Sequence, residues 1–339
     1  MRARGGAGMM EAMTSPKNPT GPGSSFAALV GSSYNDPELC GDVPSLEAMS
    51  VAAPEVPEDV DAAELRDLAV RVAGQAAALI RTRRAELAGP HGAGLHAHHT
   101  KSSAVDPVTE VDEASESFIT GELLAARPFD GLLGEEGAAR ESSSGVTWVV
   151  DPIDGTVNFL YGVPDYAVSI GAVVDGEPVA GCVVNVAQDV TYAAALGHGA
   201  TVVRGGSSPQ PVHPRTETDP ALSLVATGFG YEASRRRAQA EVLVRLLPRV
   251  RDIRRIGAAA LDICRVAEGS VDVYYEHGIK AWDCAAGTII AREAGCAVVH
   301  PGMEADGKNG AIFFAAQPSV APAAWVTLSE AKGTNKIPA

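Results

Sequence analysis

Two aspartates three residues apart mark the part of the sequence where most of the chemistry is concentrated. Asp151 follows the apolar run 148–150, and Pro152 and Ile153 separate it from Asp154. A buried strand would carry Asp151 to its end. The proline, which fixes its own φ and favours an extended residue before it, would turn the chain so that both carboxylates point to one place. Together with the Ile153 carbonyl, they are the hard oxygen ligands that Mg²⁺ prefers in proteins.

Gly155 and Thr156 extend this motif toward phosphate chemistry. Glycine lets the backbone approach a ligand closely, and two consecutive amides can hold a phosphate oxygen. The alternative is an ordinary Asp-Pro turn with two solvated acids. We favour a metal and phosphate site, because the motif follows a buried strand and leads into Gly-Thr.

Acids elsewhere in the chain are candidates for the same site, although each has an ordinary alternative. Glu135 and Glu136 follow an apolar pair, as acids in a solvated loop also would. Asp106 and Asp112 flank the start of an expected helix, where negative charge stabilises the helix dipole. Asp283 opens another expected helix, where an aspartate is a common N-cap and can still bind a metal through its second oxygen.

Hydrophobic periodicity predicts the elements that must position these acids. Apolar residues recur at helical spacing after Asp61 and Glu64, which resemble a capping box. Asp175-Gly176 between two apolar runs predicts a hairpin. In the N-terminal half we expect helices at about 61–87 and 108–126, and strands at 148–150, 166–174, 179–184 and 192–195. In the C-terminal half we expect strands at 222–227, 252–256, 271–276, 297–300 and 311–315, and helices at about 235–247, 258–268, 283–294 and 318–331.

The chain of 339 residues divides into four predicted parts. Pro, Gly or Ser occupies 21 of the first 60 positions, so we expect a disordered extension over 1–58. Two α+β halves follow at 59–220 and 221–331, and residues 332–339 would form a flexible tail. Five of the six methionines lie in the first 49 residues. Translation from Met49 is therefore a hypothesis that the intact mass of the native protein would test.

Composition limits the classes of function. The formal charge of −15 argues against nucleic acid as the main ligand, but a small phosphorylated substrate with bound metal is compatible with it. The apolar runs are too short for a membrane helix, and charge and glycine follow the N-terminus where a signal peptide would be apolar. The five cysteines form no C-x-x-C pair and are expected to be reduced. We expect a cytoplasmic protein.

Five segments together resemble the inositol monophosphatase family of lithium-sensitive, magnesium-dependent phosphatases. They are Asp106–Asp112, Gly134–Glu136, Trp148–Phe159, Arg254–Leu261 and Tyr275–Gly295. The resemblance spans about residues 62–330 and is strongest to bacterial, actinobacterial-type inositol-1-monophosphatases. It implies an α+β fold of the layered α-β-α-β-α sandwich type, one active site between the two halves, and a homodimer.

The resemblance also implies metal ligands. Two or three Mg²⁺ ions would bind in each site. Glu135, Asp151 and the Ile153 carbonyl would bind the first ion, and Asp151, Asp154 and Asp283 would bind the second. Two such cations would stabilise the entering and leaving oxygens of the transferred phosphoryl group.

The same resemblance implies roles in catalysis and substrate binding. Asp106 and Thr156, with Glu135 close by, would orient and deprotonate the attacking water. The expected substrate contacts are Glu135, Ile153, Asp154, Gly155, Thr156, Arg254, Gly257, Ala258, Ala259, Glu276 and Asp283. Ala258 departs from the family pattern, in which Ser or Thr is common, so one side-chain hydrogen bond to a polyol would be absent.

The implied reaction is hydrolysis of a phosphate monoester, with myo-inositol 1-phosphate as the first expectation and metal-activated water as the nucleophile. Histidinol phosphate, a nucleotide 3′-phosphate and fructose bisphosphate are alternative substrates, because a few wall residues decide specificity. A non-enzymatic regulator that binds RNA or a transcription factor is an alternative of another class.

Two clusters of other residues have ordinary interpretations. The histidines His91, His96, His98 and His99 fit no standard zinc spacing, and we expect solvated loop residues. Eight arginines lie between Arg235 and Arg255, and we expect them to line a helix face and a subunit contact. A surface for RNA or a partner protein is the alternative for this arginine cluster.

Overall fold

The computed structural model describes residues 60–88, 99–100, 107–108 and 110–339, all within the compact unit Asp36–Ala339. The extension predicted over 1–58 and the histidines His91, His96 and His98 lie outside the described residues. A short antiparallel pair joins β1 (His99–Thr100) to β2 (Pro107–Val108). Among the helices that the structure describes, none is long and apolar enough to cross a membrane.

Helix α2 (Ala62–Ala88) begins where the sequence predicts it. Asp61 Oδ1 accepts hydrogen bonds from the amides of Ala63 at 2.8 Å and Glu64 at 3.2 Å. These bonds satisfy two of the amides that have no partner inside the first turn of a helix. The apolar stripe of α2 packs with that of α3 (Glu110–Ala126) in one buried cluster.

The first sheet has eight strands in the order β10-β9-β8-β7-β6-β5-β3-β4. Their bounds are β3 (Gly131–Gly134), β4 (Ala139–Arg140), β5 (Val146–Asp154), β6 (Ala167–Val174), β7 (Glu177–Asn185), β8 (Val190–Ala195), β9 (Ala200–Arg204) and β10 (Gln210–Pro211). The predicted hairpin is confirmed between β6 and β7, where Asp175 and Gly176 have φ values of 50° and 80°. Two positive φ values in a two-residue turn match the twist of the paired strands.

The second sheet has five strands in the order β12-β11-β13-β15-β14. Its strands are β11 (Leu224–Thr227), β12 (Asp252–Arg254), β13 (Val273–His277), β14 (Ala297–Val299) and β15 (Ile312–Ala316). The helices of this half are α5 (Ala233–Leu246), α6 (Ala259–Ala267), α7 (Ala281–Glu293) and α8 (Ala321–Glu330). Because β11 is parallel to both β12 and β13, the loops that follow these three strands leave the sheet at one edge.

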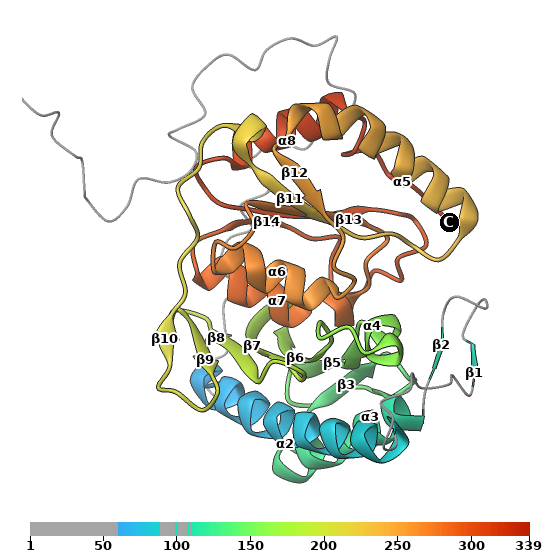
Figure 1. The fold of residues 1–339 in the computed structure, drawn as a ribbon. Coiled ribbons are helices and arrows are strands. Elements are labelled where there is room, and N and C mark those ends of the chain that lie inside the picture. Colours follow the sequence, from blue (N-terminus) through green and yellow to red (C-terminus); the bar gives the residue numbers. More distant parts are fainter. Residues whose placement is uncertain (1–59, 89–98, 101–106, 109) are drawn as a thin grey trace, which may run out of the picture. The chain divides into compact units, whose positions relative to one another are not determined.

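The elements form five layers, which confirms the predicted α-β-α-β-α sandwich (Figure 1). Helices α2 and α3 cover one face of the eight-stranded sheet, and α6 and α7 lie between the two sheets. Helices α5 and α8 cover the outer face of the five-stranded sheet, where Leu246 and Leu328 face Val225 and Val273 across a small apolar cavity. Gly181 lets α7 approach the first sheet, because a Cβ there would lie 2.8 Å from the Cα of Ala286.

Several elements differ from the prediction. Helix α4 (Thr156–Tyr161) and strands β4, β9 and β10 were not expected, because two to six residues are too few to establish a periodic pattern. The final residues, for which we expect a flexible tail, pack against the fold. Ile337 is buried, and its amide donates to the Gly310 carbonyl at 2.9 Å. The four cysteines in the described part of the chain are buried and free.

Candidate active site

Strands β3 and β5 bring the first two acids side by side. The strands are parallel, and Gly134 pairs with Val150, so Glu135 and Asp151 follow paired residues at one edge of the sheet. The Glu135 amide donates to the Val150 carbonyl at 3.2 Å, which fixes this start of the loop. Asp151 is only 1% exposed.

The Asp151–Asp154 segment is a bulged strand, where the sequence predicts a turn after Asp151. Asp151 pairs with Ser169 and Asp154 with Ala167, so three steps along β5 face two steps along β6. A bulge of this kind changes the direction of the side chains on the strand. The Thr156 hydroxyl donates to the Ile153 carbonyl at 3.2 Å, and Gly155, with φ of 88°, is the N-cap of helix α4.

Asp154 connects the first sheet to helix α6. One carboxylate oxygen accepts from the Ala259 amide at 3.1 Å, and the other accepts from the Ala260 amide at 2.7 Å. These amides belong to the first turn of α6, where backbone donors have no partner within the helix and the helix dipole favours negative charge. The carboxylate that the sequence assigns to the metal site is therefore also a link between the two halves.

Asp283 approaches the same region from helix α7. The structure corrects its predicted N-cap position, because Lys280 is the N-cap and Asp283 lies three residues further on. The Asp283 carboxylate reaches back to accept a hydrogen bond from the Lys280 amide at 2.7 Å. Its side chain is thereby fixed at the start of the helix, on the layer between the two sheets.

The acids act on one another electrostatically. Burial raises the pKa of Asp154 well above its usual value, and the negative charges of Asp283 and Glu135 raise it further. The pKa of Asp283 is raised to about 7, mainly by burial and also by the negative charges of Glu135 and Glu276. The hydrogen bond from the Lys280 amide opposes this shift. A carboxylate with such neighbours is stabilised either by a proton or by a cation.

The donor set therefore has the chemistry of a magnesium site, since it consists of carboxylate and carbonyl oxygens. Within the part of the chain that the structure describes, no three His, Cys, Asp or Glu side chains are arranged to hold a metal ion. Asp106, which the sequence also assigns to the site, lies outside the described residues.

Comparison with known proteins decides the family of this site. The model of the inositol monophosphatase family matches residues 61–332. The chain is 47% identical over 290 residues to the Inositol-1-monophosphatase SuhB of Mycobacterium tuberculosis, covering 83% of this chain and 98% of the relative. This chain belongs to the inositol monophosphatase family. It is also 40% identical over 199 residues to the Nus factor SuhB of Xylella fastidiosa, covering 58% of this chain and 70% of the relative.

Solved structures of the inositol monophosphatase family share the fold. Mycobacterium tuberculosis SuhB matches with a TM-score of 0.70 and 43% identity, over 82% of this chain and 100% of that chain. Inositol monophosphate-bound SaIMPase-II matches with a TM-score of 0.60 and 27% identity, over 81% of this chain and 93% of that chain. The layered fold of this family member is thus the fold of its relatives.

The expected substrate wall lies at the edge where β11, β12 and β13 end. Glu276 lies in β13, and its carboxylate is so close to Gly228 that a Cβ there would lie 1.7 Å from Oε2. The Tyr274 hydroxyl donates to Glu276 Oε2 at 2.6 Å. Burial raises the pKa of Glu276, while Tyr274, Arg255 and Arg235 oppose the shift. Gly257, with φ of 101°, lies in the loop that precedes α6.

Arg254 and Arg255 face different surroundings, which their adjacency in sequence does not indicate. Arg254 is exposed and pairs with Asp252 at 2.6 Å in the edge strand β12. The Arg255 guanidinium lies 5.8 Å from the centre of the Phe229 ring, and a Cβ on Gly257 would lie 2.5 Å from its Nη1. The arginine beside Glu276 and the wall loop is therefore Arg255, where the resemblance implies Arg254.

Glu116 is a further residue that sequence analysis missed. It is buried in α3, and its two carboxylate oxygens accept hydrogen bonds from the amides of Glu136 at 2.8 Å and Ala138 at 2.9 Å. These bonds hold the loop that presents Glu135. An acid on the apolar side of a helix, between Ser115 and Ile119, is the sequence signal that identifies such a residue.

The arginine cluster does not form a single surface. Arg235 is buried and donates to the carbonyls of Ile337, Gly307 and Lys308. Arg249 pairs with Glu330 of α8. The predicted common helix face is thus wrong for Arg235, because its guanidinium fastens the C-terminal residues to the fold.

Proposed function

We propose that this chain is a magnesium-dependent phosphate monoester hydrolase that releases myo-inositol and phosphate from inositol 1-phosphate. The observation that supports this most strongly is the position of three acids, Asp154 in β5, Asp283 in α7 and Glu135 in the loop after β3, whose negative charges act on one another. Glu135, Asp151, Asp154, Asp283 and the Ile153 carbonyl would hold the ions. Bound magnesium would supply the positive charge that polarises the phosphoryl group and activates water.

The side chains around the metal ligands would orient the nucleophile. The Thr156 hydroxyl donates a hydrogen bond to the Ile153 carbonyl, so its oxygen is available to accept a hydrogen bond from water. Asp106 would accept the proton of that water, with Glu135 nearby. The amides of Gly155 and Thr156 would bind the phosphoryl oxygens, because Gly155 leaves the backbone accessible.

The polyol would bind the wall formed by Gly257, Ala258, Ala259 and Glu276. The Glu276 carboxylate accepts the Tyr274 hydroxyl through one oxygen, which leaves acceptor capacity for substrate hydroxyls. A relative described as inositol monophosphate-bound supports this substrate class. Because Ala258 has no hydroxyl to bind a polyol, the alternative substrates histidinol phosphate, a nucleotide 3′-phosphate and fructose bisphosphate are included in the same test.

The test is phosphate release from a panel of these esters, with and without magnesium. We expect the highest kcat/KM for inositol 1-phosphate and negligible turnover after chelation of the metal. Asp151→Asn should abolish turnover while circular dichroism and the thermal midpoint stay close to wild type. Turnover that is equal for all esters would refute the substrate, and turnover by Asp151→Asn would refute the metal site.

A regulatory role is the second candidate, which the Nus factor relative supports. Arg236 and Arg237 are exposed on α5 and would form the surface for RNA or a protein partner. Charge reversal at both positions should leave phosphate release unchanged and weaken such binding. We also propose that the protein is a cytoplasmic homodimer. Sedimentation of the purified protein would test the dimer.

A further inference from the structure

We propose that Asn158 is a positioning residue. It fixes the loop of the substrate wall that carries Gly257 relative to the phosphate-binding loop, Gly155 and Thr156. The inference rests on the proposed function, since it concerns the wall that would bind the polyol. Asn158 lies in helix α4, three residues after Gly155, and the sequence analysis gives it no role.

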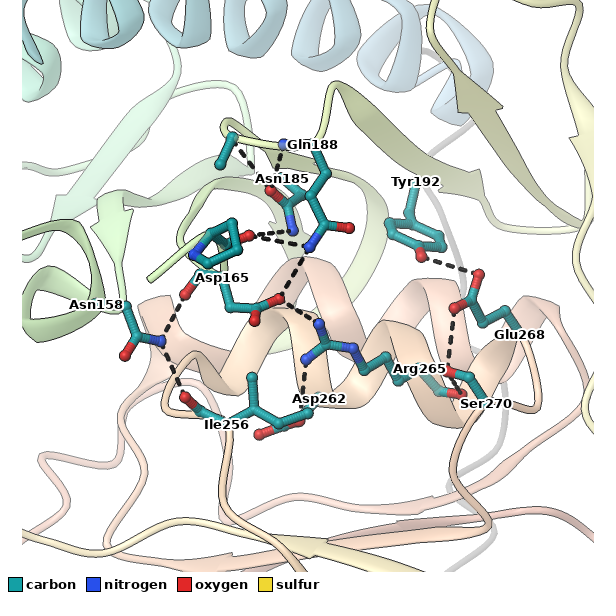
Figure 2. Close-up of polar contacts among 12 residues, drawn as sticks. Asn158, Asp165, Asn185, Gln188, Tyr192, Ile256, Asp262, Arg265, Glu268 and Ser270 are labelled. Carbon is teal, nitrogen blue, oxygen red and sulfur yellow. Dashed lines mark hydrogen bonds and ion pairs between the residues drawn. The ribbon is translucent and has the colours of Figure 1, made fainter. Parts of the chain in front are cut away.

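The side-chain amide of Asn158 donates two hydrogen bonds to backbone carbonyls. Nδ2 donates to the Ile256 carbonyl at 2.9 Å and to the Asp165 carbonyl at 2.7 Å (Figure 2). Ile256 precedes the wall residue Gly257, whereas Asp165 belongs to the loop between α4 and β6. One side chain therefore connects helix α4 and the loop that follows it to Ile256, which lies 98 residues further along the chain.

The backbone around Asn158 is closely packed. A Cβ on Gly155 would lie 3.0 Å from the Asp165 carbonyl oxygen and 3.1 Å from that of Gly257. A Cβ on Gly257 would lie 3.2 Å from Asn158 Nδ2. With such spacing, a shift of the wall loop by less than 1 Å changes its contacts with the phosphate-binding loop.

The Asp165 end of the bridge is itself fixed to helix α6. The Arg265 guanidinium forms an ion pair with Asp165 through Nη2 (Figure 2). Its other terminal nitrogen, Nη1, lies 3.5 Å from Asp262 Oδ1. Gln188 donates to the Pro164 carbonyl at 3.1 Å and to Asp165 Oδ1 at 3.4 Å. Asn158 is thus the link from this anchored loop to the wall, whereas Gln188 supports only the loop.

The wall loop depends on this link because it has no regular structure. Residues 255–258 belong to no helix or strand, and the side-chain donor to the Ile256 carbonyl is Asn158. On the other side, the loop is held by Asp154 through Ala259 and Ala260. Removing the Asn158 donors would free one side of the loop and leave the metal ligands in place.

The test compares Asn158→Asp with Gln188→Ala, because aspartate keeps the shape of asparagine but has no donors. Inositol 1-phosphate reaches the wall, whereas p-nitrophenyl phosphate has no polyol. For Asn158→Asp we expect KM for inositol 1-phosphate to rise about tenfold or more, with kcat and both constants for p-nitrophenyl phosphate within about threefold. Gln188→Ala should stay within about twofold for both esters. Equal losses on the two esters, or no change, would overturn the proposal.

Hydrogen exchange gives a second measurement that needs no substrate. In Asn158→Ala and Asn158→Ser, amides of residues 256–262 should exchange faster than in wild type, while those of residues 167–174 keep their protection. If Asn158→Asp fails to fold, these two variants replace it in both assays. If the wild type does not hydrolyse inositol 1-phosphate, the proposed substrate fails, and exchange still decides the bridge. Unchanged exchange over 256–262 would overturn it.

Discussion

The carboxylate of Asp154 accepts a hydrogen bond of 2.7 Å from the backbone amide of Ala260, a residue 106 positions further along the chain. Asp154 ends strand β5 of the first sheet, and Ala260 lies in the first turn of α6. The bond joins the candidate metal site to the helix that follows the candidate substrate wall. A substitution at either residue should therefore affect both the candidate metal site and the candidate substrate wall.

The first prediction concerns Asp154→Asn. The variant keeps the shape of the side chain but removes its charge and directs an amide N–H toward a backbone N–H. We expect kcat for any hydrolysed ester to fall about 100-fold or more. Steady-state kinetics at saturating magnesium would measure this loss, with the fold checked by circular dichroism. Turnover within threefold of wild type would contradict the assignment.

The second prediction concerns the pH dependence of stability. Asp262 is buried, and burial raises its pKa to about 8, although Arg265 opposes the shift. The unfolded chain loses this proton near pH 4, as an ordinary aspartate does. Between about pH 4 and 8 the folded state therefore binds more protons, and stability falls as the pH rises through this window.

Asp262→Asn removes this titration. The stability of wild type relative to the variant should decline by up to about 1.4 kcal/mol per pH unit between pH 5 and 8. Urea denaturation at several pH values measures the difference. Parallel pH profiles of the two proteins would show that the raised pKa of Asp262 is incorrect.

The third prediction separates two adjacent arginines. Arg255→Gln should lower kcat/KM for inositol 1-phosphate about tenfold, equivalent to about 1.4 kcal/mol, because Arg255 lies beside Glu276 and Gly257. Arg254→Gln is the matched control, because Arg254 pairs with Asp252 in an exposed strand. Its kcat/KM should stay within about twofold of wild type. Equal effects of the two substitutions would contradict this assignment.

The fourth prediction compares two glycines with positive φ. A Cβ at Gly176 would meet no atom within 4 Å, so Gly176→Ala should cost only the left-handed backbone conformation, about 1 kcal/mol of unfolding free energy. At Gly155 the same Cβ would also contact the carbonyl oxygens of Asp165 and Gly257. Gly155→Ala should therefore cost at least about 2 kcal/mol and reduce turnover. Denaturant unfolding would measure the free energy of unfolding of both variants. Equal losses would show that the structure around Gly155 tolerates the methyl group.

Much of the local structure was predictable from the sequence. The start of α2 follows from Asp61 and the helical spacing after it, and the turn at Asp175-Gly176 follows from residues that tolerate positive φ. Strand β5 follows from its apolar run before Asp151. These features depend on neighbours within a few residues, so their spacing in the sequence is sufficient to predict them.

The site depends on the tertiary structure for its arrangement. The sequence determined which residue types were available: the acids around Asp151, Asp154 and Asp283, and the glycines beside them. Only packing decided that Asp154 would bond to the start of α6, that Arg255 would face Glu276, and that Asn158 would bridge to Ile256. These contacts join segments about 20 to 106 residues apart, because α6 and α7 pack between the two sheets and bring distant loops to one place. No local pattern in the chain specifies such distances, whereas close packing of the layers does.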